Sequence, residues 1–118
     1  AQNVDDLVVA WNWDSVDNET VAANIAGTNS TAVPGPYKAT PIVVEGIMYI
    51  PTSFGRVVAL DAQSGEARWV FDTRAWEAGR PANLGYNTRG VAYWEGSGKR
   101  RIFFATMLVR WSEIPMIP

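Results

Sequence analysis

Short apolar runs separated by brief polar turns dominate the middle of the chain. Four such runs follow one another, over residues 41–44, 47–52, 57–60 and 68–71. Their lengths are typical of strands, and connections this short join antiparallel neighbours. Glu45-Gly46 suits a two-residue hairpin turn. We therefore predict one four-stranded antiparallel sheet over residues 40–73.

The connection between the third and fourth strands carries its own turn chemistry. The Asp61 carboxylate can accept backbone N–H bonds across the turn, and Gly65 can take the positive φ at its end. Trp69 opens the fourth strand with a broad ring suited to packing between sheets. Asp61 and Gly65 are therefore interpreted as turn residues rather than as a functional site.

The hairpin pattern starts again after residue 88. Runs over 89–94 and 101–106 predict two more strands, with a turn over 95–99. Two prolines in the tail, 107–118, predict a poor central strand there. Before the first sheet, residues 1–14 predict one strand with Trp11 and Trp13 on one face, and 15–39 predict a polar loop in which Val21–Ala26 is a possible short helix.

Repeated four-stranded antiparallel units of this size are the blades of β-propellers. The predicted fold class is therefore all-β, about one and a half blades of a larger ring. We expect a single partial propeller domain over 1–118, divided into a strand of a preceding unit (1–14), a loop (15–39), one blade (40–73), a loop (74–88), the first half of the next blade (89–106) and an atypical tail (107–118). A blade buries its faces only against its neighbours, so we expect apolar faces to be left uncovered.

Composition removes several kinds of chemistry. The chain has no cysteine and no histidine, which excludes disulfides, thiol catalysis, Cys/His zinc sites and histidine bases within it. Ten basic and twelve acidic residues give a net charge of −2, which argues against a nucleic-acid partner. Residues 99–101 are basic and predict a solvated hairpin tip. The N-terminus lacks signal-peptide features, so the signal was removed or the chain starts inside a longer protein.

Four motifs in this order resemble a known family. They are Asn3–Trp11, Ala39–Tyr49, Ala59–Trp69 and Arg89–Trp94. Together they resemble the N-terminal part of the pyrroloquinoline-quinone (PQQ)-dependent dehydrogenases, most closely the glucose and sugar-alcohol branch. The resemblance implies an eight-bladed, quinoprotein-type propeller in a periplasmic enzyme that holds PQQ with calcium. Such an enzyme oxidises a sugar or polyol and passes the electrons to ubiquinone or a cytochrome.

The same resemblance nominates two cofactor-binding residues. Arg89 matches the arginine of the family's Arg-Gly-aliphatic-Ala-Tyr-Trp motif, which contacts the quinone, and a guanidinium suits the carboxylates of PQQ. Lys38 stands where the alcohol-oxidising branch has a carboxylate, and it serves either as a point charge for the cofactor or as a solvated loop lysine. Residues 85–88 replace the adjacent cysteines of that branch, which favours the sugar branch.

No catalytic residue and no metal ligand is predicted in this chain, because the family's calcium ligands and catalytic aspartate lie beyond the matched segment. The chain is therefore expected to be inactive alone, with the rest of the propeller missing. Two other readings stay open. One is a non-catalytic scaffold propeller, as in outer-membrane assembly factors, and the other is an unrelated small β-domain complete at 118 residues. Inter-blade packing is expected of Trp11, Trp69 and Trp94, and Trp76 lies in a loop where it can line a cavity.

Overall fold

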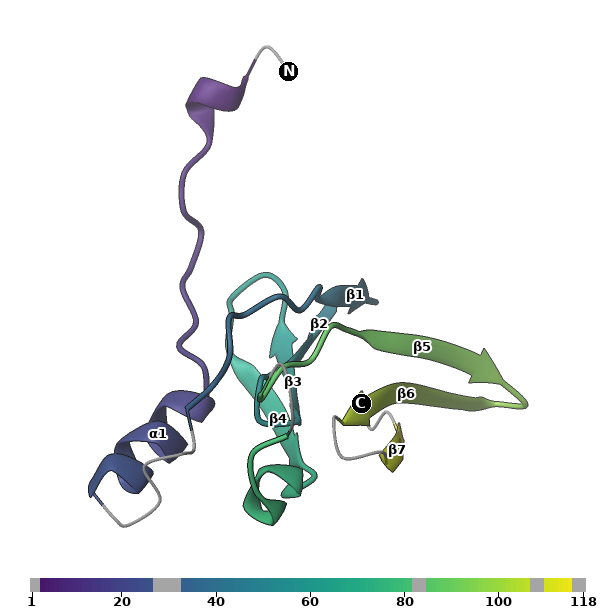
Figure 1. The fold of residues 1–118 in the computed structure, drawn as a ribbon. Helices are drawn as coiled ribbons and strands as arrows, with labels where there is room; N and C mark the ends of the chain where they lie inside the picture. The colour runs from purple at the N-terminus through teal and green to yellow at the C-terminus, as the bar shows by residue number, and fades with distance from the viewer. Residues whose placement is uncertain (1–2, 27–32, 82–84, 107–109, 116–118) are drawn as a thin grey trace.

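The computed structural model describes residues 3–26, 33–81, 85–106 and 110–115. A short 3-10 helix, η1 (Val4–Asp6), is followed by an extended arm and by helix α1 (Asp17–Ala26) (Figure 1). The rest of the described chain forms two antiparallel sheets. The fold-class prediction of successive propeller blades is confirmed in this architecture.

The first sheet has its four strands side by side in chain order. They are β1 (Ile42–Val44), β2 (Ile47–Pro51), β3 (Arg56–Asp61) and β4 (Ala67–Asp72). A 3-10 helix, η2 (Ala75–Ala78), follows. The second sheet contains β5 (Val91–Gly96), β6 (Lys99–Thr106) and β7 (Arg110–Pro115), again in chain order.

Two tight hairpin turns set the register of the first strand pair in each sheet. Glu45 and Gly46 both take positive φ, at 49° and 79°, and Ser97 and Gly98 do so at 51° and 70°. Two consecutive residues with positive φ form the type I′ turn, whose twist matches that of the strands it joins. The turn predicted over 95–99 is tighter than expected, because its outer residues continue the β5–β6 ladder.

The main core lies between the two sheets. Side chains alternate along a strand, so every second residue of the first sheet faces the second sheet. The buried residues of this core are Tyr49, Val57, Ala59, Ile102 and Phe104. Trp69 packs against them with its ring centroid 5.8 Å from that of Tyr49. Trp69 therefore serves inter-sheet packing, as predicted.

The N-terminal arm covers part of the opposite face of the first sheet. Trp11 and Trp13 pack against a second core of Ile50, Val58 and Leu60. The prediction of a strand over 1–14 is wrong for the described residues, because this segment pairs with no strand there. The arm contacts the face of the sheet rather than an edge, and the Trp11 indole donates to the Ala62 carbonyl at 3.2 Å.

The prediction for the tail, residues 107–118, also needs correction. The prediction of no blade strand over 107–118 is wrong for its middle, because β7 pairs antiparallel with β6 from Thr106–Arg110 to Arg101–Pro115. A proline is tolerated here, since β7 lies at the sheet edge and Pro115 is its last residue. The remaining residues of the tail lie outside the described part of the chain. The second sheet thus has three strands instead of two.

Helix α1 interrupts the predicted loop over 15–39 and begins four residues before the short helix considered at 21–26. The Ser15 hydroxyl accepts the backbone N–H of Asp17 at 3.3 Å, which supports the helix start. Asp17 and Glu19 lie in the first turn, where negative charge suits the helix dipole. Local capping and the contacts of Asp17 therefore explain the earlier start.

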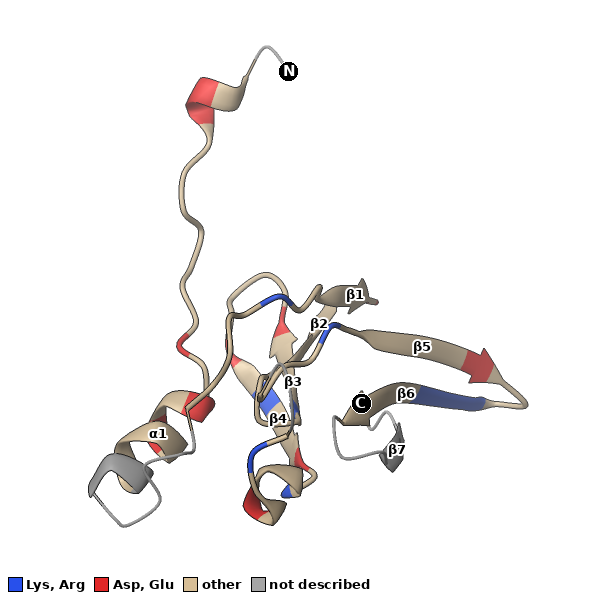
Figure 2. Ribbon diagram, viewed as in Figure 1, with Lys and Arg blue, Asp and Glu red and all other residues tan. Residues whose placement is uncertain are grey.

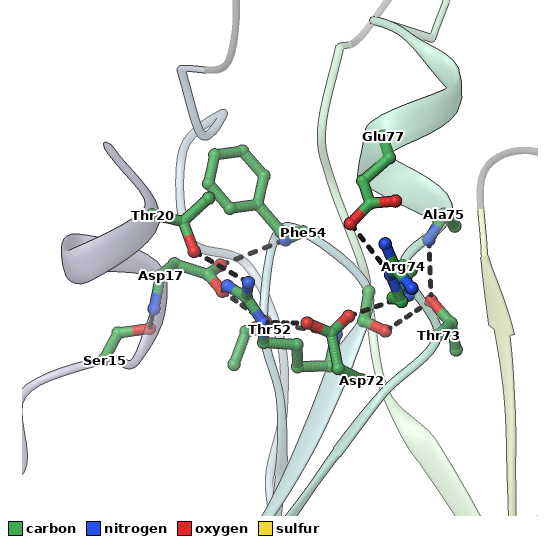
Figure 3. A network of polar contacts seen from close by, with 12 residues as sticks. Ser15, Asp17, Thr20, Thr52, Phe54, Asp72, Thr73, Arg74, Ala75 and Glu77 are labelled. Atoms are coloured by element: carbon green, nitrogen blue, oxygen red, sulfur yellow. Dashed lines mark hydrogen bonds and ion pairs between the residues drawn. The ribbon is translucent and has the colours of Figure 1, made fainter. Parts of the chain in front are cut away.

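A buried ion-pair network ties α1 to the first sheet (Figure 3). The Arg56 guanidinium donates to Asp17 from Nη1 and to Asp72 from Nε, each at 2.8 Å, and to the Thr20 hydroxyl from Nη2 at 2.7 Å. The Thr52 hydroxyl donates to Asp17 at 2.8 Å. Only 9% of the Arg56 side chain and 5% of the Asp17 side chain are exposed.

This network fixes the turn between β2 and β3. The second carboxylate oxygen of Asp17 accepts the backbone N–H of Phe54 at 3.0 Å. Burial opposes the charge of Arg56, but its hydrogen bonds to Asp72 and Asp17 outweigh that effect and raise the pKa of the guanidinium. Arg56, which lies between the predicted strands over 47–52 and 57–60, therefore joins α1, the β2–β3 turn and the end of β4.

Substituting Arg56 tests how much this network contributes to the free energy of unfolding. We predict that Arg56→Ala lowers the free energy of unfolding by about 3–5 kcal/mol, because Asp17 is left buried without its partner. Arg68→Ala is the matched control, since Arg68 pairs with Asp61 at the surface and its side chain is 56% exposed. Chemical unfolding of both variants is the measurement. Equal losses in the two variants would contradict the assignment.

Two glycines with the same backbone conformation test the contact of the arm. Gly65 has φ 77°, and a Cβ there would lie 2.6 Å from the Trp11 ring. Gly46 has φ 79° with nothing within 4 Å of its Cβ position. We predict that Gly65→Ala costs about 1–3 kcal/mol more than Gly46→Ala because of this overpacking.

Tryptophan fluorescence read alongside unfolding follows the displacement of Trp11. An emission change in Gly65→Ala that Gly46→Ala lacks is the expected result. Identical losses of stability and identical spectra in the two variants would show that the arm does not rest on this turn.

Candidate functional site

Two extended segments run side by side where the chain enters the two sheets. One precedes β1 and the other precedes β5, and isolated parallel bridges join Pro34 to Tyr86 and Thr40 to Gly90. The Gly35 amide donates to the Tyr86 carbonyl, and the Thr40 amide donates to the Arg89 carbonyl, each at 2.9 Å. The chain therefore enters β1 and β5 in the same direction and from neighbouring positions.

The two predicted cofactor-binding residues lie on these segments. Lys38 and Arg89 are both exposed. The amide bonded to the Arg89 carbonyl belongs to Thr40, two residues after Lys38, so the structure brings the two backbone positions together. Basic residues colour the chain blue just before β1 and just before β5 (Figure 2).

Neither cation is used by the described part of the fold. Within the described residues, the Lys38 and Arg89 side chains form no ion pair and no hydrogen bond. Other arginines are committed to carboxylates, such as Arg56 to Asp17 and Arg100 to Glu45 and Glu95. Arg100, predicted at a solvated hairpin tip, thus bridges the hairpins of the two sheets. Lys38 and Arg89 remain available to an external anion.

The segment that carries Arg89 is itself buried, although the sequence predicted only a loop over 74–88. Tyr86 is 3% exposed and its ring meets that of Phe54 edge-on, with centroids 4.9 Å apart. Its hydroxyl donates to the Trp76 carbonyl at 3.2 Å. Asn87 and Thr88 are also buried. An exposed cation therefore stands on a packed support, which limits the entropy lost when it binds a ligand.

The aromatic and turn residues take largely structural roles. Trp76 lines a small cavity beside Phe54, as its loop position allowed. Trp94, expected between blades, lies on the outer face of the second sheet with its ring 5.6 Å from the Arg101 guanidinium. Asp61 accepts from Arg68 and from the Ser64 and Gln63 amides, and these bonds lower its pKa to about 2. Asp61 thus serves the turn, as predicted.

A larger groove of about 510 Å³ lies between the N-terminal arm, the start of α1 and the segment before β1. Trp11, Trp13, Asp17 and Tyr37 contribute to its lining. Burial, followed by the nearby charge of Asp17, raises the pKa of Tyr37. Neither Lys38 nor Arg89 lines this groove, so it is separate from the predicted site.

The described residues offer positive charge for an anion, and they contain no group of side chains that could hold a metal ion. No group of three or more His, Cys, Asp or Glu in this part of the chain could hold a metal ion. Among the same residues, no helix is long and apolar enough to cross a membrane. The two exposed cations, Lys38 and Arg89, are suited by their charge to an anionic ligand.

Comparison with known proteins identifies the source of this arrangement. The family model for the β-propeller domain of PQQ glucose/ethanol/alcohol dehydrogenases matches residues 1–114. The dehydrogenase subunit of alcohol dehydrogenase (quinone) from Gluconobacter oxydans is 30% identical over 111 residues, covering 89% of this chain and 11% of that protein. The 1-butanol dehydrogenase (cytochrome c) of Thauera butanivorans is 43% identical over 60 residues, covering 50% of this chain and 9% of that protein.

A solved structure of a related quinohemoprotein has a similar fold over part of this chain. The crystal structure of quinohemoprotein alcohol dehydrogenase from Comamonas testosteroni superposes with a TM-score of 0.50 at 30% sequence identity, covering 62% of this chain and 10% of that one. The chain thus spans about a tenth of the length of these relatives. The named relatives are alcohol dehydrogenases and do not single out the glucose and sugar-alcohol branch. The family match excludes an unrelated small β-domain, and the chain belongs to the PQQ-dependent glucose/ethanol/alcohol dehydrogenases, as part of their β-propeller domain.

Proposed function

We propose that this chain is the part of a PQQ-dependent dehydrogenase that helps to hold the quinone while a CH–OH group is oxidised. The observation that carries the proposal is a pair of exposed cations, Lys38 and Arg89, which lie on adjoining segments and have no partner among the described residues. Membership of the family supplies the identity of the cofactor. The relatives' names, which mention a quinone and cytochrome c, support these two classes of electron acceptor.

The residues present fit this cofactor in charge and shape. PQQ carries three carboxylates and an ortho-quinone, and the planar guanidinium of Arg89 can make paired, charge-assisted hydrogen bonds to either. The ammonium of Lys38 acts as a compact positive charge for a carboxylate. When bound, the quinone accepts two electrons from the substrate carbon. Lys38 and Arg89 orient the quinone and neutralise its charge.

The substrate class has two candidates. Alcohols are supported by the named relatives, all of which are described as alcohol dehydrogenases. Sugars or polyols, our sequence-based prediction, are supported by one feature of this chain. Residues 85–88 form a packed segment without the adjacent cysteines of the alcohol branch. We propose a sugar or polyol, and substrate competition decides between the two.

Calcium and a periplasmic location complete the proposal. Both rest on the family resemblance, in which calcium accompanies PQQ and the enzyme is exported. The family resemblance assigns the calcium ligands and the catalytic aspartate to parts of the propeller beyond the matched segment. A non-catalytic scaffold propeller is the remaining candidate, and it requires that the protein bind no PQQ.

Cofactor titration tests the role of the two cations. In the full-length protein, Arg89→Ala should weaken PQQ binding about 10- to 100-fold, the equivalent of about 1.5–3 kcal/mol for one charged hydrogen-bonding group. Lys38→Ala should weaken it less, because a lysine acts as a point charge. Lys99→Ala is the control, since Lys99 is exposed at a hairpin tip. Binding is followed through the absorbance of PQQ.

Unfolding measurements separate a binding role from a structural one. Exposed side chains without partners contribute little to stability, so Arg89→Ala and Lys38→Ala should unfold like the unmodified protein. Unchanged PQQ affinity in both variants would remove these residues from the site. Absence of PQQ binding by the unmodified protein would favour the scaffold candidate.

A direct comparison of substrates tests the finer proposal. Full-length protein loaded with PQQ and calcium should oxidise glucose or a sugar alcohol with a higher kcat/KM than 1-butanol. Reduction of an artificial electron acceptor reports each rate. A preference for 1-butanol would assign the protein to the alcohol branch and leave the role of Arg89 unaffected.

A further inference from the structure

A small cavity lies between the β2–β3 turn, η2 and the end of β6, and it is lined in part by the segment before Arg89. Its volume is about 20 Å³, and its lining comes from the β2–β3 turn, η2, residues 85–88 and the end of β6. Three buried side-chain atoms in the described part of the chain lack a hydrogen-bond partner: Trp76 Nε1, Asn87 Oδ1 and Thr106 Oγ1. All three residues line this one cavity.

The concentration of unpaired atoms at one place points to a ligand. Buried polar groups are nearly always hydrogen-bonded, because burying them unpaired is unfavourable. Asn87 and Thr106 are each only 8% exposed, so bulk solvent does not satisfy them. The lining can take up one small molecule without moving, since a water needs about 10–15 Å³ of such space and two to four polar partners.

The chemistry of the three atoms selects the ligand. Trp76 Nε1 only donates, Asn87 Oδ1 only accepts, and the Thr106 hydroxyl does both. An indole N–H disfavours a cation, and an amide carbonyl disfavours an anion. A neutral molecule that accepts one hydrogen bond and donates another suits all three. We propose that this cavity binds one structural water molecule, which bridges Trp76, Asn87 and Thr106.

The bridge has a consequence for the candidate site. It joins η2, the 85–88 segment and β6, so that one molecule ties η2 and the second sheet to the backbone directly before Arg89. The water thus helps to fix the support from which Arg89 is presented. This role holds whichever anion Arg89 binds.

A crystal structure of the full-length protein at high resolution tests the site directly. The expected result is one electron-density peak of water size within hydrogen-bonding distance of at least two of the three atoms. No peak, a peak of a heavier ion, or direct hydrogen bonds among the three side chains would overturn the proposal.

Matched variants test the bridging. Thr106→Val removes the hydroxyl with little change in shape, and Trp76→Phe removes the indole donor together with part of the ring. Thr88→Val is the control, because Thr88 lines the same cavity at 7% exposure and its hydroxyl is not among the unpaired atoms.

The water should lose occupancy in Thr106→Val and Trp76→Phe and keep it in the control. The melting temperature of Thr106→Val should also fall further than that of Thr88→Val. Full occupancy in both test variants would refute the bridge, and if Thr106→Val does not fold, the density in Trp76→Phe decides.

Discussion

The guanidinium of Arg56, held between the carboxylates of Asp17 and Asp72, is the interaction on which this arrangement depends. A buried ion pair of this kind is a weak source of net stability, but removing one partner is costly because the other charge stays buried. The network therefore determines the local conformation more than it adds to net stability. It fixes where α1 meets the first sheet and which conformation the β2–β3 turn adopts. That turn carries Phe54, the residue on which the packing of the neighbouring segment rests.

From this anchor, a chain of contacts leads to the candidate site. The Phe54 ring meets Tyr86, and Tyr86 lies in the segment that ends at Arg89. The parallel bridges then join that segment to the residues around Lys38. Two positive charges that have no partner within the described part of the chain are thereby held on packed backbone. Because the backbone that carries these charges is already packed, little backbone entropy is lost when a polyanion binds.

Much of the fold could be predicted from sequence because blades are built from local signals. Alternation, the Glu45-Gly46 turn and the Asp61 turn each act over a few residues. The features that could not be predicted depend on contacts between residues distant in sequence. Residues 7–14 resemble a strand but lie against the face of a sheet, and the packing of Tyr86 depends on Phe54, which is distant in sequence. Arg56 looked like a turn residue because its partner Asp17 lies 39 positions away. The site residues came from family motifs, since an exposed arginine or lysine has no local signature.

The central proposal is that Arg89, which has no partner among the described residues, holds the cofactor of the family. The most direct measurement is a structure of the full-length protein crystallised with PQQ. The account predicts the Arg89 guanidinium in contact with the quinone or a carboxylate of the cofactor, with the segment around Tyr86 placed as it is here. An Arg89 side chain paired to a protein carboxylate, with the cofactor bound elsewhere, would contradict it.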